Sequence, residues 1–167
     1  MELDSGEKFR GALEFTRTVF GVSIASLPRE SDLEHGEVIQ QGYHFQAAEQ
    51  LRAFENELCW AFLTRLDSIF EALWTRLKFA GAAVEAAIAN SPDLSTDDKT
   101  AFKKLRVLRN VFHHGDGDWN LLKNRGNLPA HEYESEPQLT YEEVDAYAGL
   151  YRKLSAILIA KSEAEGA

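Results

Sequence analysis

The chain has a single cysteine and a single methionine among its 167 residues, and it contains only four prolines. One cysteine excludes a disulfide within the chain and a zinc site built from several thiolates. No apolar run approaches the roughly 18 residues that a membrane-spanning helix requires. The first residues are acidic and lack the apolar stretch of a secretory signal, so we expect a cytoplasmic protein with no membrane partner.

Apolar and charged residues are present in the proportions of an ordinary folded domain. Hydrophobic residues make up 44% of the chain and charged residues 27%, while glycine and proline together number fifteen. A disordered or collagen-like chain has fewer apolar residues or far more glycine and proline, so both classes are excluded. We predict one domain over residues 1–167, long enough to bury a substantial core.

Negative charge dominates the chain, but one segment reverses it. The net charge is −9, whereas residues 99–125 hold seven bases and two acids and carry +5, which leaves −14 for the other 140 residues. A basic patch on an acidic body is typical of a phosphate-binding surface. It is equally consistent with a solvated helix face that neutralises acidic surroundings, so charge alone leaves both interpretations open.

The apolar periodicity predicts an all-α antiparallel bundle of four main helices plus one short helix. A proline that follows Ser91 ends the short helix, and Thr140 with Glu143 forms a capping-box pattern at the start of the last one. The helices are expected over residues 7–24, 43–79, 81–90, from 95 or 96 through 112, and from 140 onward, with loops over 26–42 and 116–139.

The predicted helix over residues 43–79 is apolar on two stripes, displaced from each other by roughly 100°. One stripe runs from Leu51 to Leu73, and the other includes Cys59 and Trp74. Such a helix either lies at the centre of the bundle or packs on one side against a second subunit. The second alternative agrees with a homodimer, and in that case the apolar surface of residues 58–74 is the candidate contact.

A basic and polar cluster lies near the C-terminal end of the third long helix. An imidazole titrates near neutral pH and exchanges a proton with a 2′-hydroxyl or a leaving oxygen. A guanidinium stays charged and holds phosphate oxygens bidentately. This chemistry suits binding or cleavage of a phosphodiester without a metal, although histidine at a helix end and arginine beside acids also serve structure alone. At 100° per residue, Lys103, Arg106, Asn110 and His114 are predicted to share one helix face, with Arg109 and His113 at the border between that face and the core side.

The string from Arg109 to His114 reads R-N-x-x-x-H and resembles the signature of HEPN-domain ribonucleases, near the end of a late helix in a helical bundle. The resemblance implies a metal-independent endoribonuclease that acts on RNA as a toxin or in antiviral phage defence. It implies a homodimer whose active site forms where two copies of the motif meet, with an antitoxin or regulatory protein as a further partner. By this resemblance Arg109 and His114 are the catalytic pair, and Asn110 orients them or the substrate.

Three neighbouring residues, Lys103, Arg106 and His113, are expected to bind the substrate. Arg106 with His113 also fits the looser form of the motif, in which four to six residues separate the arginine from the histidine. The acid/base is therefore either His113 or His114. We prefer the pair of Arg109 and His114, because only that choice places an asparagine directly after the arginine.

Several features keep other interpretations open. Asp67 and Glu71 lie one turn apart and are either acidic partners that orient Arg109 or ordinary surface carboxylates. Cys59 is expected to be a small core residue. Residues 113–118 contain metal-ligand types, but no second pair stands at a recognised spacing, so neither metal nor cofactor is predicted. The alternative function is a non-catalytic dimerising helical module that binds RNA or an acidic partner protein through its basic helix.

Overall fold

The computed structural model describes residues 4–33, 36–40, 42–114 and 139–166, which are mostly helical and confirm the all-α class. The loop predicted over residues 116–139 lies, except for its last residue, outside the described residues. No helix in the described ranges is both long and apolar enough to cross a membrane. In chain order the elements are α1 (Ser5–Ala25), α2 (Glu30–Leu33), β1 (Val38–Gln40), β2 (Tyr43–Phe45), α3 (Ala48–Arg76), α4 (Gly81–Asn90), α5 (Thr96–His114) and α7 (Tyr141–Gly166).

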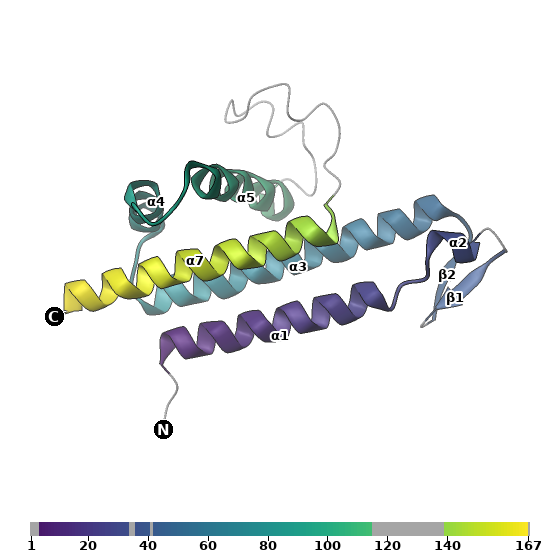
Figure 1. Cartoon of the computed structure of the whole chain (residues 1–167), viewed down its shortest axis with the longest axis horizontal. Coiled ribbons are helices and arrows are strands. Elements are labelled where there is room, and N and C mark those ends of the chain that lie inside the picture. Colours follow the sequence, from purple (N-terminus) through teal and green to yellow (C-terminus); the bar gives the residue numbers. More distant parts are fainter. Residues whose placement is uncertain (1–3, 34–35, 41, 115–138, 167) are drawn as a thin grey trace.

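Three long helices, α1, α3 and α7, lie side by side, and α4 and α5 lie on the opposite side of α3 and α7 from α1 (Figure 1). Helix α1 runs antiparallel to α3, because Phe9 packs against Phe70 while Phe20, further along α1, packs against Phe62. The four main helices and the short α4 agree with the predicted number. The position of α5 matters most for function, since this helix carries the basic cluster.

Helices α3 and α7 run in the same direction, which departs from the antiparallel order predicted for the bundle. Near their N-terminal ends the backbone N–H of Leu139 donates to Asn56 Oδ1 at 2.8 Å. Further along both helices the hydroxyl of Tyr151 donates to Asp67 Oδ1 at 2.9 Å. Two parallel neighbours need a long connection, and residues 77–140, which include α4 and α5, provide it.

Side-chain caps explain where α1 and α7 begin. The N–H of Glu7 donates to Asp4 Oδ1 at 2.7 Å, and the N–H of Asp4 donates back to the Glu7 carboxylate at 3.2 Å. Thr140 and Glu143 form the same reciprocal pair before α7, which confirms the capping box predicted there. The predicted bounds of α4 and the start of α5 at Thr96 are confirmed as well.

The long helix α3 begins later than predicted, because the residues before it form a strand. Strand β2 pairs antiparallel with β1 beside Gly42, whose φ of 84° lies in the region that favours glycine. Phe45 is buried, and Tyr43 packs against Phe54 with 4.5 Å between ring centroids. The prediction of a plain loop over residues 26–42 is also wrong, since the segment contains α2 and β1. In this segment the aromatic side chains pack against α3 as a strand, although the spacing of apolar residues predicts a helix.

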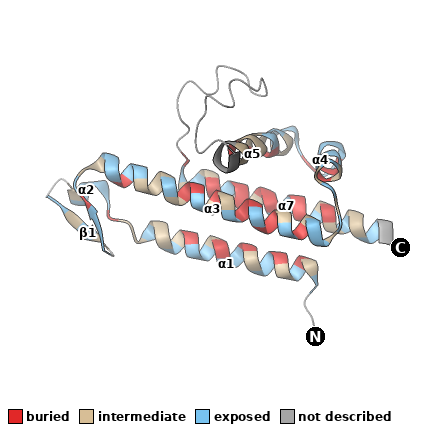
Figure 2. Cartoon of the chain, turned by 180° about the vertical axis from the view of Figure 1, so that it is seen from behind, coloured by how far each residue is buried: buried red, intermediate tan, exposed pale blue. Residues whose placement is uncertain are grey.

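The second apolar stripe of α3 is covered by the chain itself. Cys59, Trp60, Leu63 and Phe70 are each no more than 4% exposed. Figure 2 shows the buried residues concentrated along α3 and α7. Of the two arrangements that the stripes allowed, α3 takes the central position in the bundle. Trp74 is the one of the five residues of this stripe that stays half-buried.

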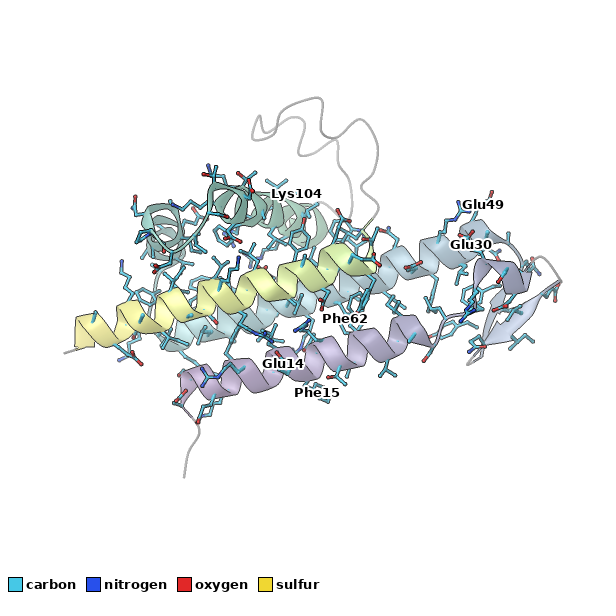
Figure 3. All side chains as sticks on the ribbon, in the orientation of Figure 1. Glu14, Phe15, Glu30, Glu49, Phe62 and Lys104 are labelled. Carbon is cyan, nitrogen blue, oxygen red and sulfur yellow. The ribbon has the colours of Figure 1, made fainter. Side chains whose placement is uncertain are left out.

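One apolar surface remains exposed on α1. Phe15 is 70% exposed, Val22 62% and Val19 40%. Their spacing of four and three residues puts them on one side of the helix, and we call these three residues the α1 face. Figure 3 shows Phe15 directed away from the bundle, whereas Phe62 lies between α3 and α1. The α1 face is thus distinct from the core.

Candidate functional site

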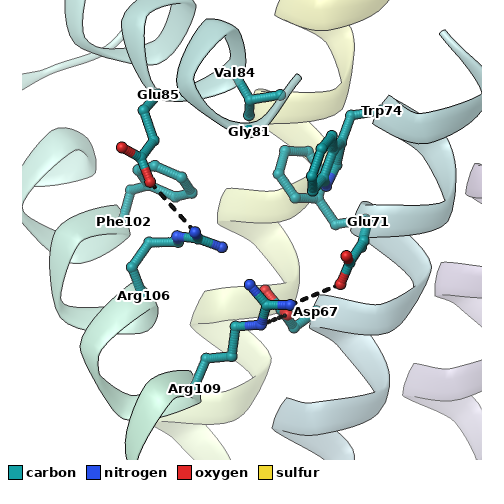
Figure 4. A pocket seen from close by; sticks show the side chains of 10 residues that line it. Asp67, Glu71, Trp74, Gly81, Val84, Glu85, Phe102, Arg106 and Arg109 are labelled. Atoms are coloured by element: carbon teal, nitrogen blue, oxygen red, sulfur yellow. Dashed lines mark hydrogen bonds and ion pairs between the residues drawn. The ribbon is translucent and has the colours of Figure 1, made fainter. Parts of the chain in front are cut away.

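Arg109, the first residue of the R-N-x-x-x-H string, is held by two carboxylates of α3. Its Nε lies 2.6 Å from Asp67 Oδ2 in an ion pair, although this buried Nε has no hydrogen-bond partner among the described residues. Its Nη2 donates to Glu71 Oε2 at 2.7 Å (Figure 4). The side chain of Arg109 is 20% exposed and that of Asp67 is 8% exposed, so this ion pair is shielded from solvent. Of the two interpretations of Asp67 and Glu71, the structure supports the one that makes them acidic partners of Arg109, although the Glu71 side chain is also 45% exposed.

Asp67 has a second partner on α7. The hydroxyl of Tyr151, a residue only 2% exposed, donates to Asp67 Oδ1 at 2.9 Å. Burial, and then the neighbouring Asp67 carboxylate, raise the pKa of Tyr151 well above its ordinary value. The hydroxyl therefore stays protonated and remains a donor. Because Tyr151 and Arg109 occupy the two oxygens of Asp67, helices α3, α5 and α7 together fix the position of the guanidinium.

Arg106 and Arg109 both border a small cavity between α3, α4 and α5. On the far side of it, Arg106 Nη2 lies 3.3 Å from Glu85 Oε1 of α4. The cavity volume is about 10 Å³, the space of a single water molecule. Its two guanidiniums face three carboxylates, those of Asp67, Glu71 and Glu85, so its walls carry a net charge of −1. An anion can enter only by displacing one of the carboxylates.

A much larger groove of about 700 Å³ lies between α4 and α5, and we call it the α4–α5 groove. Lys99, Lys103 and Arg106 line it together with one carboxylate, that of Glu85, which gives its walls a net charge of +2. Asn110 lines it as well. The prediction that Lys103, Arg106 and Asn110 share one helix face is confirmed, because all three border this groove.

Arg109 and Asn110, the two motif residues whose side chains the structure describes, face different spaces. Arg109 faces α3 and the small cavity, whereas Asn110 lines the α4–α5 groove, and Arg106 borders both spaces. His113 and His114 belong to the last turn of α5, and their side chains lie outside the described residues. The structure thus brings Arg109 together with the carboxylates of α3 and not with Asn110.

The positive charge of residues 99–125 is partly neutralised where the structure describes it. Lys104 lies 3.9 Å from Glu143, and both arginines of α5 pair with carboxylates. Within the described ranges, Lys99 and Lys103 make no ion pair. The interpretation that this segment neutralises nearby acids is therefore confirmed for Lys104 and the two arginines, while Lys99 and Lys103 remain candidates for the phosphate-binding interpretation.

Tyr151 and Glu85 belong to the site although the sequence analysis did not select them. In the sequence, Tyr151 has the pattern of a core residue of the last helix. Its partner Asp67 is 84 residues away along the chain, so helical spacing cannot predict the contact. Glu85 is the one charged residue of the alanine-rich α4, which makes it the candidate on that helix for an ion pair with the basic cluster.

Cys59 is a core residue, as predicted. It is 0% exposed, and burial raises its pKa to about 12. The thiolate is the nucleophilic form of cysteine, so this thiol is inert at neutral pH. Across the described part of the chain, no three His, Cys, Asp or Glu residues are placed to hold a metal ion.

We expect Cys59 to resist alkylation in the folded protein. At pH 8 a thiol with a pKa of about 12 is ionised in about one molecule in 10⁴, and the side chain is shielded from reagent. Treatment with iodoacetamide followed by mass spectrometry should leave the native protein unmodified and modify it fully in concentrated urea. Rapid modification of the native protein would contradict this burial.

The candidate site has two parts, on two sides of α5. One is the Arg109 guanidinium, fixed to Asp67. The other is the positively charged α4–α5 groove, which extends along α5 as far as Asn110, one turn before the helix ends at His114. No family model, no curated protein and no solved structure matches this chain.

Proposed function

We propose that the chain is a metal-independent endoribonuclease of the HEPN type that acts in the cytoplasm as a toxin or antiviral-defence effector. The observation that carries the proposal is that one helix, α5, holds the guanidinium of Arg109 on one side, paired with Asp67, and borders on another side a positively charged groove that ends one turn before His114. RNA cleavage uses both features: a surface that holds phosphates, and a preorganised cation where charge develops in the transition state.

In the proposed reaction His114 accepts the proton of a ribose 2′-hydroxyl, and that oxygen attacks the adjacent phosphorus. A bond from phosphorus to the 2′-oxygen forms and the bond to the 5′-oxygen breaks. The products are a 2′,3′-cyclic phosphate and a 5′-hydroxyl, whose oxygen takes up a proton from water, and the protonated His114 then returns its proton to the solvent. Arg109 stabilises the charge on the non-bridging oxygens, and Asn110 orients this pair or the substrate. The substrate is further bound by Lys103, Arg106 and His113, of which His113 is the alternative acid/base.

The carboxylates around Arg109 set a condition on this reaction. The Glu71 side chain is 45% exposed, whereas that of Asp67 is 8% exposed. An arriving phosphate therefore replaces Glu71 and leaves Asp67 in place. The guanidinium exchanges one anion for another and keeps the orientation that Asp67 and Tyr151 impose.

We further propose a homodimer with the active site at its interface, because the resemblance of the motif implies a site built from two copies. The two stripes of α3 give no support to this proposal, since the chain buries them itself. The contact therefore has to bring two copies of α5 together. An antitoxin or regulatory protein is a further proposed partner, because an unrestrained ribonuclease damages the cell that makes it.

One observation favours a second function. Asp67 and Glu71 together more than neutralise the single positive charge of Arg109, as in a salt bridge that serves stability alone. On this view the chain is a non-catalytic dimerising helical module that binds RNA or an acidic partner protein through α5. The two functions differ in whether bound RNA is cut.

The test is incubation of a labelled structured RNA with the wild-type protein in excess EDTA. We expect cleavage that leaves 2′,3′-cyclic phosphate ends, which mass spectrometry detects. The matched control is the same RNA with 2′-O-methyl groups, which keeps every phosphate but lacks the attacking hydroxyl and should stay intact. Binding without cleavage would favour the non-catalytic module, and cleavage that EDTA abolishes would contradict the mechanism.

A further inference from the structure

The side of α5 that borders the α4–α5 groove carries four polar residues in a row. Lys99, Lys103, Arg106 and Asn110 follow one another at intervals of four, three and four residues, which places them on one helix face. At 1.5 Å per residue the row extends for about 16 Å along the helix axis. It therefore forms a linear array of charge that points toward the end of the helix at His114.

The facing wall is α4, whose groove-lining residues are mostly small. Ala82, Ala86 and Ala89 are exposed, lie four and three residues apart, and line the groove opposite the basic row. Because methyl groups take up little space, the groove reaches about 700 Å³ although α4 and α5 are consecutive helices. The wall gives a ligand room without deep pockets for large apolar side chains.

The positive charge in this groove is available to a ligand. Lys103 is exposed, and in the described part of the chain neither it nor Lys99 makes an ion pair. Arg106 pairs with Glu85, whose side chain is 56% exposed and so is readily displaced. The whole chain carries −9, so a groove with a net charge of +2 reverses the local field and attracts polyanions.

We propose that the α4–α5 groove binds the phosphate backbone of single-stranded RNA, with Lys99, Lys103 and Arg106 contacting successive phosphates and Asn110 contacting the nucleotide nearest His114. That the strand is RNA rests on the proposed ribonuclease function. The structure adds two points to it: the place where the strand binds, and that the strand is unpaired. Cations at intervals of about 4.5 to 6 Å suit a flexible strand. A groove of about 700 Å³ has room for part of an unpaired strand but not for a duplex.

The lining also indicates how such a strand is recognised. Among the described residues that line the groove, Phe102 is the one aromatic residue, and it is 6% exposed, so bases find no ring on which to stack. Contacts to phosphates carry no base information, and binding should therefore be independent of sequence and strongly dependent on salt. An acidic amphipathic peptide fits less well, because its apolar anchors need pockets that the alanine wall does not provide.

The probe is a fluorescein-labelled 2′-O-methyl oligouridine of about 12 nucleotides, a length within the usual range of single-strand sites. It cannot be cut by the proposed reaction, so fluorescence anisotropy measures binding alone. We expect Lys103→Glu to weaken binding at least about tenfold. The double substitution Lys99→Ala, Lys103→Ala should reduce the slope of log K against log salt by about 1.4, from about 0.7 per lost phosphate contact.

Two further variants sharpen the test. Glu85→Gln removes the anion that competes for Arg106 without changing the size of the side chain, and it should tighten binding about two- to fivefold, the equivalent of one exposed ion pair. Arg10→Glu is the matched control. It makes the same change in charge as Lys103→Glu at an exposed position of α1, on the far side of the bundle, and should alter the dissociation constant less than about twofold.

Several results would overturn the proposal. The first is that the wild-type protein does not bind the oligonucleotide, and the second is that Lys103→Glu and Arg10→Glu weaken binding equally. The third is that a 2′-O-methyl duplex binds as tightly as the single strand. The fourth is that a glutamate-rich helical peptide binds more tightly than the oligonucleotide. Cleavage is measured separately on unmodified RNA. Binding that depends on the groove without any cleavage would contradict the ribonuclease function but support RNA binding by the groove. Cleavage that Lys103→Glu does not change would contradict RNA binding by the groove but not the ribonuclease function.

Discussion

Replacement of Asp67 by alanine is expected to lower the free energy of unfolding by about 3–5 kcal/mol, the usual cost of breaking a buried ion pair from one side. Asp67 connects α3 to α5 through Arg109 and to α7 through Tyr151. The substitution leaves a guanidinium that is only 20% exposed without its closest anion, and it leaves the buried Tyr151 hydroxyl without its acceptor. Urea denaturation followed by circular dichroism measures the change.

Glu71→Ala is the matched control for this prediction. It removes a carboxylate from the same guanidinium, but the Glu71 side chain is 45% exposed, so we expect a loss of no more than about 1 kcal/mol. Asp67→Asn should fall between the two, because the amide keeps an oxygen for Tyr151 and loses the charge that faces Arg109. Equal losses for Asp67→Ala and Glu71→Ala would show that burial does not distinguish the two carboxylates.

His114→Ala is expected to reduce RNA cleavage by a factor of about 10²–10⁴, the usual contribution of a positioned general acid or base. The affinity for uncut RNA should change little, because the phosphate contacts proposed here come from the α4–α5 groove. The loss should therefore appear in kcat and not in KM. Single-turnover cleavage with excess protein, beside anisotropy with a 2′-O-methyl RNA, separates the two quantities.

His113→Ala is the control that decides between the two histidines. If His114 is the acid/base, the His113 variant should keep most of its activity and lose some affinity, as expected for a residue that contacts the substrate. The reverse pattern would make Arg106 and His113 the catalytic pair. Cleavage that survives both substitutions would come from another site or from a contaminating nuclease, and the assignment to this motif would be wrong.

Local sequence signals were sufficient to locate most of the helices. The pairing of Thr140 with Glu143, and the proline after Ser91, act within one helical turn, so the sequence contains all that is needed to place those ends. The helical period likewise predicted the shared face of Lys103, Arg106 and Asn110. Such features depend on the geometry of a single helix.

Features that depend on distant segments were not predictable in the same way. The period of α3 shows that Cys59 and Trp60 are buried, but not that the chain's own helices cover them. The parallel course of α3 and α7 and the contact between Asp67 and Tyr151 arise from packing across 84 residues. For Arg109 the sequence offered two carboxylates as candidate partners, and only the position of α3 shows that it is tied to both.

The α1 face described above lies on the other side of the α3–α7 layer from the α4–α5 groove (Figure 1). Two protomers that associate back to back through Phe15 and its neighbours would leave both grooves open and both copies of α5 pointing outward. Two protomers that meet through α5 would bring their motifs together and leave both α1 faces uncovered. The two modes of assembly are therefore compatible within one particle, and chains that use both would form an alternating filament instead of a closed pair.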